Sequence, residues 1–160
     1  WIVGDGGARK KLEAALATAR VSNVRMEPPV PRSELVKYYR KADVLFLHLN
    51  DHDAFRRVLP SKVFEYAATG KPVLAGVKGY ARKFIVENVA NAAVFDPCDP
   101  EGLVRALRSL NMGLTPRDEF IRRFLRTNIA AAMARDVLDL LRSPFGRSYR
   151  HEESREAAVT

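Results

Sequence analysis

Short apolar runs alternate with segments of helical periodicity along the first 110 residues of the chain. The runs are three to six residues long and rich in β-branched side chains, which predicts buried strands. The expected strands cover residues 1–3, 24–27, 44–49, 73–75 and 93–95. Apolar positions at helical spacing predict helices over residues 9–20, 33–40, 61–69, 81–88, 100–110, 116–125 and 129–141.

This alternation of strands and helices predicts an α/β fold. Strands joined through helices pair in parallel, and a parallel sheet needs helices on both faces. We therefore expect a Rossmann-like domain over residues 1–142, with a mostly parallel sheet. Residues 143–160 carry Pro144, Gly146 and many charges, which predicts a charged tail without fixed structure.

Composition restricts the number of domains, the kind of partner and the cellular compartment, but it does not indicate a function. The chain has 160 residues, 47% of them hydrophobic, which suits one domain with its own core. Twenty-seven Lys and Arg against nineteen Asp and Glu give a net charge of +8, which favours anionic partners. The lone Cys98 excludes an internal disulfide. No run of about 18 apolar residues and no cleavable signal occurs, so a cytoplasmic setting is the default expectation.

The most informative segment is residues 59–76, LPSKVFEYAATGKPVLAG. Pro60 and Ser61 precede a helix, and Ser61 is a residue type that caps helix starts, so free amide groups there would face an anion such as phosphate. Lys62 adds a cation, and Glu65, three residues on, can accept hydrogen bonds from a diol such as ribose. An ordinary amphipathic helix explains the same spacing.

This segment resembles the donor-binding motif of the family-4 glycosyltransferases, which are two-domain enzymes of GT-B architecture, and above all their bacterial polysaccharide branch. The matching positions are Pro60, Ser61, Lys62, Phe64, Glu65, Tyr66, Ala68, Gly70, Pro72 and Val73. Flanking landmarks follow in the same order, so the resemblance covers roughly residues 1–141.

The resemblance implies the C-terminal, nucleotide-sugar-binding domain of a retaining transferase. Amides around Leu59 to Ser61, with Lys62, would face the diphosphate, and Glu65 would hold the ribose. The base would lie against Val30 and Pro31. A UDP-sugar is the most common donor in such families, and no cofactor or protein-held metal is implied.

The chain departs from the family pattern at two places. The family's domain opens with one more strand and helix, carrying an Arg and a Lys, and is preceded by an acceptor-binding N-terminal domain. We find none of these here, and we expect the isolated piece to bind a donor without transferring sugar. The family's first glutamate would fall on Arg57, so Glu65 stands alone. Arg57 either meets an anionic group or is solvated.

Three further patterns carry weaker expectations. Asp51, His52 and Asp53 are metal-ligand types, but polar contact with the donor sugar fits them better. Gly79 closes a loop that approaches the donor in family members, and it could equally be a plain connector. The Gly4 to Gly7 turn is no dinucleotide fingerprint, because its third glycine would fall on Arg9.

A different class of function stays open as the alternative. Arginines on the last expected helices and in residues 143–160 could dock on anionic lipid or nucleic acid. Interspersed acids and the lack of a nucleic-acid motif argue against nucleic acid. For a polysaccharide transferase, a lipid-linked acceptor and a peripheral location at the inner membrane surface remain open.

Overall fold

The computed structural model describes residues 1–142. The tail expected over residues 143–160 lies outside the described residues. The chain divides into two compact units, Trp1–Asp43 and a second unit that begins at Val44, and each is described by itself.

The first unit is a strand–helix–strand–helix segment. Its elements are β1 (Ile2–Val3), α1 (Arg9–Thr18), β2 (Met26–Glu27) and α2 (Arg32–Lys41). The two strands pair in parallel, with Ile2 beside Met26. The Arg9 guanidinium donates to the carbonyls of Gly4 at 2.6 Å and Glu27 at 2.9 Å, so it ties the start of α1 to the ends of both strands. This clamp explains why an arginine stands after the glycine turn.

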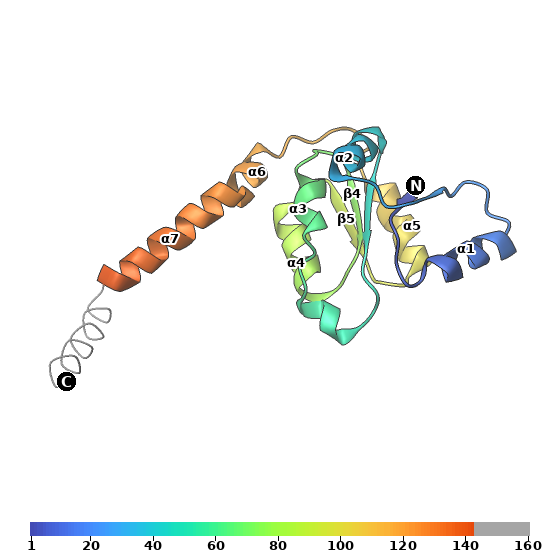
Figure 1. Ribbon diagram of the computed structural model, residues 1–160, viewed down its shortest axis with the longest axis horizontal. Coiled ribbons are helices and arrows are strands. Elements are labelled where there is room, and N and C mark those ends of the chain that lie inside the picture. The colour runs from blue at the N-terminus through green and yellow to red at the C-terminus, as the bar shows by residue number, and fades with distance from the viewer. Residues whose placement is uncertain (143–160) are drawn as a thin grey trace. The chain divides into compact units, whose positions relative to one another are not determined.

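The second unit holds a parallel sheet in the order β3-β4-β5. Figure 1 shows α3 and α4 on one side of this sheet and α5 on the other, so the expected α/β class with helices on both faces is confirmed. The bounds are β3 (Leu45–His48), η1 (Asp53–Arg57), α3 (Lys62–Ala67), β4 (Val73–Gly76), α4 (Gly79–Asn88), β5 (Ala92–Phe95), α5 (Pro100–Ser109), α6 (Asp118–Phe124) and α7 (Arg126–Arg142).

Each expected strand and helix is present, with ends displaced by a few residues. The short 3-10 helix η1 was not expected from the sequence. Over residues 1–142 the strands form two parallel sheets, β1-β2 and β3-β4-β5, and no ladder joins them.

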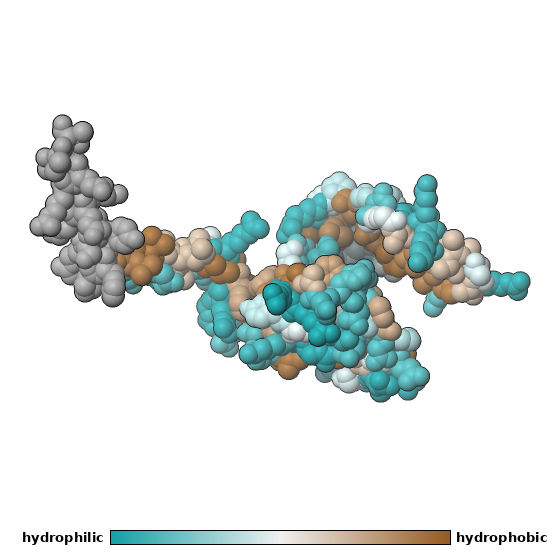
Figure 2. All heavy atoms as spheres, turned by 90° about the horizontal axis from the view of Figure 1, so that it is seen from below, coloured by the Kyte–Doolittle hydropathy of each residue, from teal (hydrophilic) through white to brown (hydrophobic). Residues whose placement is uncertain are grey.

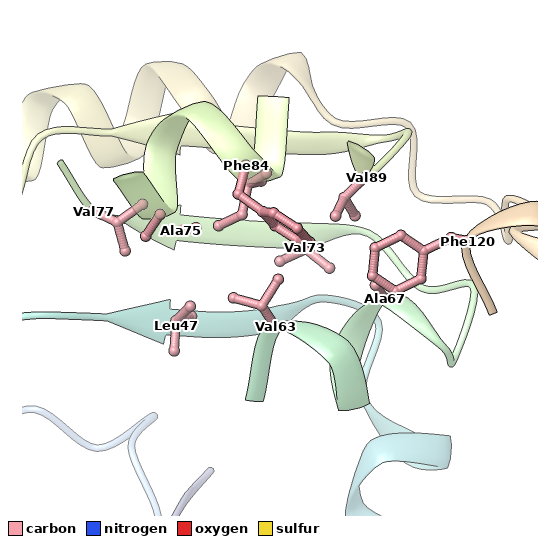
Figure 3. Packing of buried hydrophobic residues seen from close by; sticks show 11 residues of the cluster. Leu47, Val63, Ala67, Val73, Ala75, Val77, Phe84, Val89 and Phe120 are labelled. Atoms are coloured by element: carbon pink, nitrogen blue, oxygen red, sulfur yellow. The ribbon is translucent and has the colours of Figure 1, made fainter. Parts of the chain in front are cut away.

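The core of the second unit lies between the sheet and the layer of α3 and α4 (Figure 3). All four residues of β4 are buried, as a central parallel strand requires. Val63 and Ile85 contribute side chains that are at most 1% exposed. Other members seen in Figure 3 are Leu47, Ala67, Val73, Ala75, Val77, Phe84, Val89 and Phe120.

Gly70 ends α3 as the Gly-Lys-Pro sequence predicts. Its φ of 75° lies in the left-handed region that follows many helices and favours glycine. Its carbonyl accepts the Thr115 amide at 2.8 Å, and a Cβ on Gly70 would lie 3.1 Å from the Thr115 oxygen. The turn therefore both stops the helix and seats the segment that leads into α6.

Arg117 is the one buried charged residue of the described chain, at 6% exposure. Its guanidinium donates to the carbonyls of Ala67 at 3.1 Å, Lys71 at 3.0 Å, Ala90 at 2.8 Å and Asn91 at 3.3 Å. Burial lowers the pKa of Arg117, because removal from water disfavours the charged form. The carbonyls at the end of α3 and after α4 carry the negative end of the helix dipoles and compensate the charge.

The face of the sheet toward α5 carries aromatic rings. The Phe46 ring stacks on those of His48 and Phe95, and all three ring centroids are 6.1 to 6.2 Å apart. The rings of His48 and Phe95 close over Gly76, which lies between them in register. Phe46 is 49% exposed, and the rings form one wall of an apolar hollow of about 360 Å³ whose lining also includes Cys98, Asp99, Pro100 and Leu103.

Helix α7 buries none of its residues in the described chain. Figure 2 shows hydrophobic side chains along its surface. Met133, Val137 and Leu140 are exposed and recur at helical spacing. Within residues 1–142, no helix combines the length and the apolarity that a membrane span requires.

Replacing Arg117 with alanine should destabilise the second unit strongly. The change removes the donor that the carbonyls of Ala67, Lys71 and Ala90 share, and losing one partner of a buried charged network typically costs about 3–5 kcal/mol. Chemical denaturation followed by circular dichroism measures the loss. Arg122 is exposed on α6, the helix that follows Arg117, and the control Arg122→Ala should change stability by about 0.5 kcal/mol or less. Equal stability of the two variants would contradict the assigned role.

Replacing Gly76 with alanine should also destabilise the fold. The added Cβ would lie 2.5 Å from the His48 ring and 2.6 Å from the Phe95 ring, and overpacking costs about 1–3 kcal/mol. Adding His48→Ala to this variant should recover part of the loss. Gly6→Ala is the control, because a Cβ there meets nothing within 4 Å. Thermal unfolding of the four proteins tests the explanation, which fails if Gly76→Ala and Gly6→Ala melt alike.

Candidate functional site

The candidate residues of the second unit lie where the parallel strands end. His48 and Gly76 are in register at the carboxyl ends of β3 and β4. The chain leaves β3 through η1 and reaches α3, and it leaves β4 through Val77 and Lys78 to α4. Open α/β sheets bind their ligands at this edge. The topology therefore gathers residues 49–62 and 77–79 on one side of the sheet.

The segment from Leu59 to Lys62 enters α3 with polar groups exposed. Leu59 and Pro60 are half-buried, whereas Ser61 and Lys62 are exposed. The amides of Leu59, Ser61 and Lys62 donate no hydrogen bond to any group of the described chain. Such unbonded donors are what a helix start offers to an anion.

The expected capping role of Ser61 is wrong. Ser61 stands at the N-cap position, but its side chain makes no capping hydrogen bond. Its φ of −58° and ψ of −28° are already helical, whereas a capping serine needs extended backbone for its hydroxyl to reach the amides of the first turn. The Ser61 hydroxyl is thus not engaged in capping α3.

Glu65 lies one turn after Lys62 on α3 and is half-buried. The next residue, Tyr66, is also half-buried and packs against the hydrophobic core. Burial raises the pKa of Tyr66, and the negative charge of Glu65 raises it further. Lys62 and Glu65 therefore bring both signs of charge to the exposed side of α3, while Tyr66 serves packing.

The acids of the loop after β3 are paired within the protein. Asp51 accepts a hydrogen bond from Lys78 Nζ at 3.0 Å, and Asp53 forms an ion pair with Arg56 Nε at 3.1 Å. The His52 ring lies 5.6 Å from the Phe55 ring, between centroids. All three expected sugar contacts, Asp51, His52 and Asp53, are exposed at this edge.

Gly79 has a structural reason to be glycine. Its φ is 62°, and a Cβ would lie 2.2 Å from the carbonyl oxygen of Arg56. The start of α4 is thereby pressed against η1, and the Lys78–Asp51 pair joins the same two loops. Sequence reasoning singled out this loop for its glycines and overlooked Lys78, because the partner of Lys78 lies 27 residues away.

Two cations at this edge have no carboxylate partner. Arg57, the last residue of η1, and Lys62, the first of α3, are exposed, and neither side chain forms an ion pair or hydrogen bond with any of residues 1–142. They contrast with Arg56 and Lys78, which are each paired.

The two residues expected at the base belong to the first unit. Pro31 occupies the N-cap position of α2, and its carbonyl accepts the amides of Glu34 and Leu35 at 3.0 Å. Val30 is half-buried and Pro31 is exposed. The base contact expected of Val30 and Pro31 stays a prediction.

Among residues 1–142, no three His, Cys, Asp or Glu side chains come together in a way that could hold a metal ion. His48 faces the α5 side of the sheet, where its Nε2 accepts the Cys98 amide at 3.2 Å. It does not join Asp51 and Asp53 in a shared cluster.

A family model matches most of the chain. No curated protein and no solved structure matches the chain significantly. The family model described as "Glycosyl transferases group 1" matches residues 1–123, which include both sheets, η1, α3 and the loop before α4. Because this match covers more than half of the sequence, the chain belongs to the group 1 glycosyltransferases.

Proposed function

We propose that this chain is the donor-binding part of a retaining glycosyltransferase and holds a nucleotide-sugar at the carboxyl edge of β3 and β4. The observation that carries the proposal is the meeting of Lys62, Glu65 and the unbonded amides of Leu59, Ser61 and Lys62 at this edge, in a chain of the group 1 glycosyltransferase family. Transfer of a sugar from such a donor requires that the nucleoside diphosphate leave with its negative charge stabilised.

The diphosphate binds at the segment from Leu59 to Lys62. Unbonded amides and the Lys62 ammonium are donors, and phosphate oxygens are acceptors, so the two sets match. Charge that builds up on the departing diphosphate in the transition state strengthens these same contacts, which is how such a site accelerates transfer.

Glu65 holds the ribose of the nucleotide. A carboxylate accepts two hydrogen bonds, and the vicinal hydroxyls of ribose donate two. Because Glu65 lies one helical turn from Lys62, a nucleotide bound by both would extend along α3. Uracil is the base that we test first.

The parent reaction builds a polysaccharide or glycolipid. This assignment rests on the resemblance of residues 59–76 to the bacterial polysaccharide branch. A lipid-linked acceptor at the cytoplasmic surface of the inner membrane would suit that chemistry. The net charge of +8 favours approach to anionic lipid as well as to anionic donors.

Binding of nucleotides by the purified chain tests the donor site. We expect UDP or another nucleoside diphosphate to bind, with NAD not binding, when each is titrated by calorimetry at near-physiological salt. Lys62→Gln and Glu65→Gln should each raise Kd about tenfold, which corresponds to about 1.4 kcal/mol. Lys83→Gln and Glu101→Gln are the controls, because both residues are exposed on other helices and form only long ion pairs of 3.9 and 3.6 Å.

Two results would contradict the donor-site proposal. The first is that none of UDP, GDP, ADP and dTDP binds to a chain whose circular dichroism shows a folded α/β protein. The second is that a nucleotide binds equally well to the Lys62, Glu65 and control variants. Loss of all binding at moderate salt would favour a nonspecific basic surface instead.

A further inference from the structure

The charged side chains between β3 and α3 divide into a paired set and an unpaired one. Asp51 is paired with Lys78 and Asp53 with Arg56, at 3.0 and 3.1 Å. Arg57 follows directly, and its guanidinium contacts no carboxylate or carbonyl of residues 1–142. The acids of this loop are thus already occupied, and Arg57 is left for a partner outside the described chain.

The backbone that carries Arg57 is held in place. The carbonyl of the preceding residue, Arg56, lies against Gly79, where a Cβ would come within 2.2 Å of its oxygen. The Lys78–Asp51 pair fixes the other end of the same loop to the start of α4. Figure 1 shows η1, in the colour of residues near 55, at the lower end of the sheet and of α4. Arg57 therefore starts from a defined position at the edge where the strands end.

Arg57 is also near the proposed diphosphate site. It precedes Ser61 by four residues, and a chain of that length spans at most about 14 Å. The long Arg57 side chain can therefore reach a group attached to a diphosphate at Leu59 to Lys62, which on a nucleotide-sugar is the sugar itself.

We propose that Arg57 binds an acidic group on the donor sugar, so that the donor is a nucleotide-linked uronic acid and not a neutral hexose. The inference rests on the proposed function. Guanidinium is a planar, always charged fork that binds a carboxylate through two parallel hydrogen bonds. A neutral sugar offers hydroxyls, which do not compensate this charge. Lys62 and the amides beside it take the diphosphate, so the two anionic parts of the donor have separate partners.

The test compares acidic and neutral donors that share a nucleotide. UDP-glucuronate and UDP-glucose form one pair, and GDP-mannuronate and GDP-mannose form the other. Each of the four is titrated separately into the purified chain, and so are free UDP and free GDP. In one of the pairs, the acidic sugar should bind at least tenfold more tightly than the neutral one. Arg57→Gln should abolish this preference without changing the Kd of the free diphosphate, and Arg57→Lys should retain part of it.

Arg108→Gln is the matched control, since Arg108 is an exposed arginine on α5 without an ion pair in residues 1–142, and it should keep the full preference. Equal binding of the acidic and neutral sugars, or a preference that survives Arg57→Gln, would overturn the role of Arg57 and leave the donor site intact. Failure of every nucleotide, including UDP and GDP, would overturn the proposed function and this inference together.

Discussion

The buried guanidinium of Arg117 is the interaction on which the rest of the second unit depends. It donates hydrogen bonds to the carbonyl oxygens of four residues. They are Ala67 at the end of α3, Lys71 just before β4, and Ala90 and Asn91 just before β5. Helix and strand ends leave carbonyl oxygens with spare acceptor capacity, and one arginine donates to several of them at once. The carbonyls of Ala67 and Asn91 also accept main-chain amides, so the guanidinium adds to those hydrogen bonds. Because the carbonyl dipoles compensate the charge, the site needs no carboxylate, and Arg117 can stay 6% exposed.

This arrangement divides the sheet into a fixed edge and an adaptable one. At the amino edge of β4 and β5, Arg117 is itself buried, and its contacts are hard to replace. At the carboxyl edge, the loops are joined by exposed ion pairs, Lys78 with Asp51 and Arg56 with Asp53. Exposed pairs contribute about 0–1 kcal/mol each, so a ligand can exchange them for its own contacts at little cost. A phosphate or carboxylate that arrives there meets cations that are free to turn toward it.

The sequence predicts the local elements well and the long-range contacts poorly. β4 could be recognised because a buried central strand is apolar throughout, and the end of α3 because Gly70, Lys71 and Pro72 follow it. The contacts of Arg117 could not, because its partners are main-chain carbonyls up to 50 residues away that carry no side-chain signature. Ser61 shows that a local prediction from residue type can also be wrong. Its residue type favours capping, but the chain enters α3 with Ser61 already helical, and only the backbone angles reveal this.

The sequence identifies the segment that forms the candidate site, but it does not predict how the side chains of that segment are positioned. Lys62 and Glu65 share α3 with Ala67, so the helix whose last residue bonds Arg117 also carries the charges at the opposite edge. At about 1.5 Å per residue, the six residues of α3 span about 9 Å, which is too short for bending to absorb a displacement. A shift of the buried end therefore moves the charged end with it. The position of the charged groups is thus set by the contacts of Arg117 at the opposite edge of the sheet. A motif that covers only residues 59–76 cannot specify these contacts.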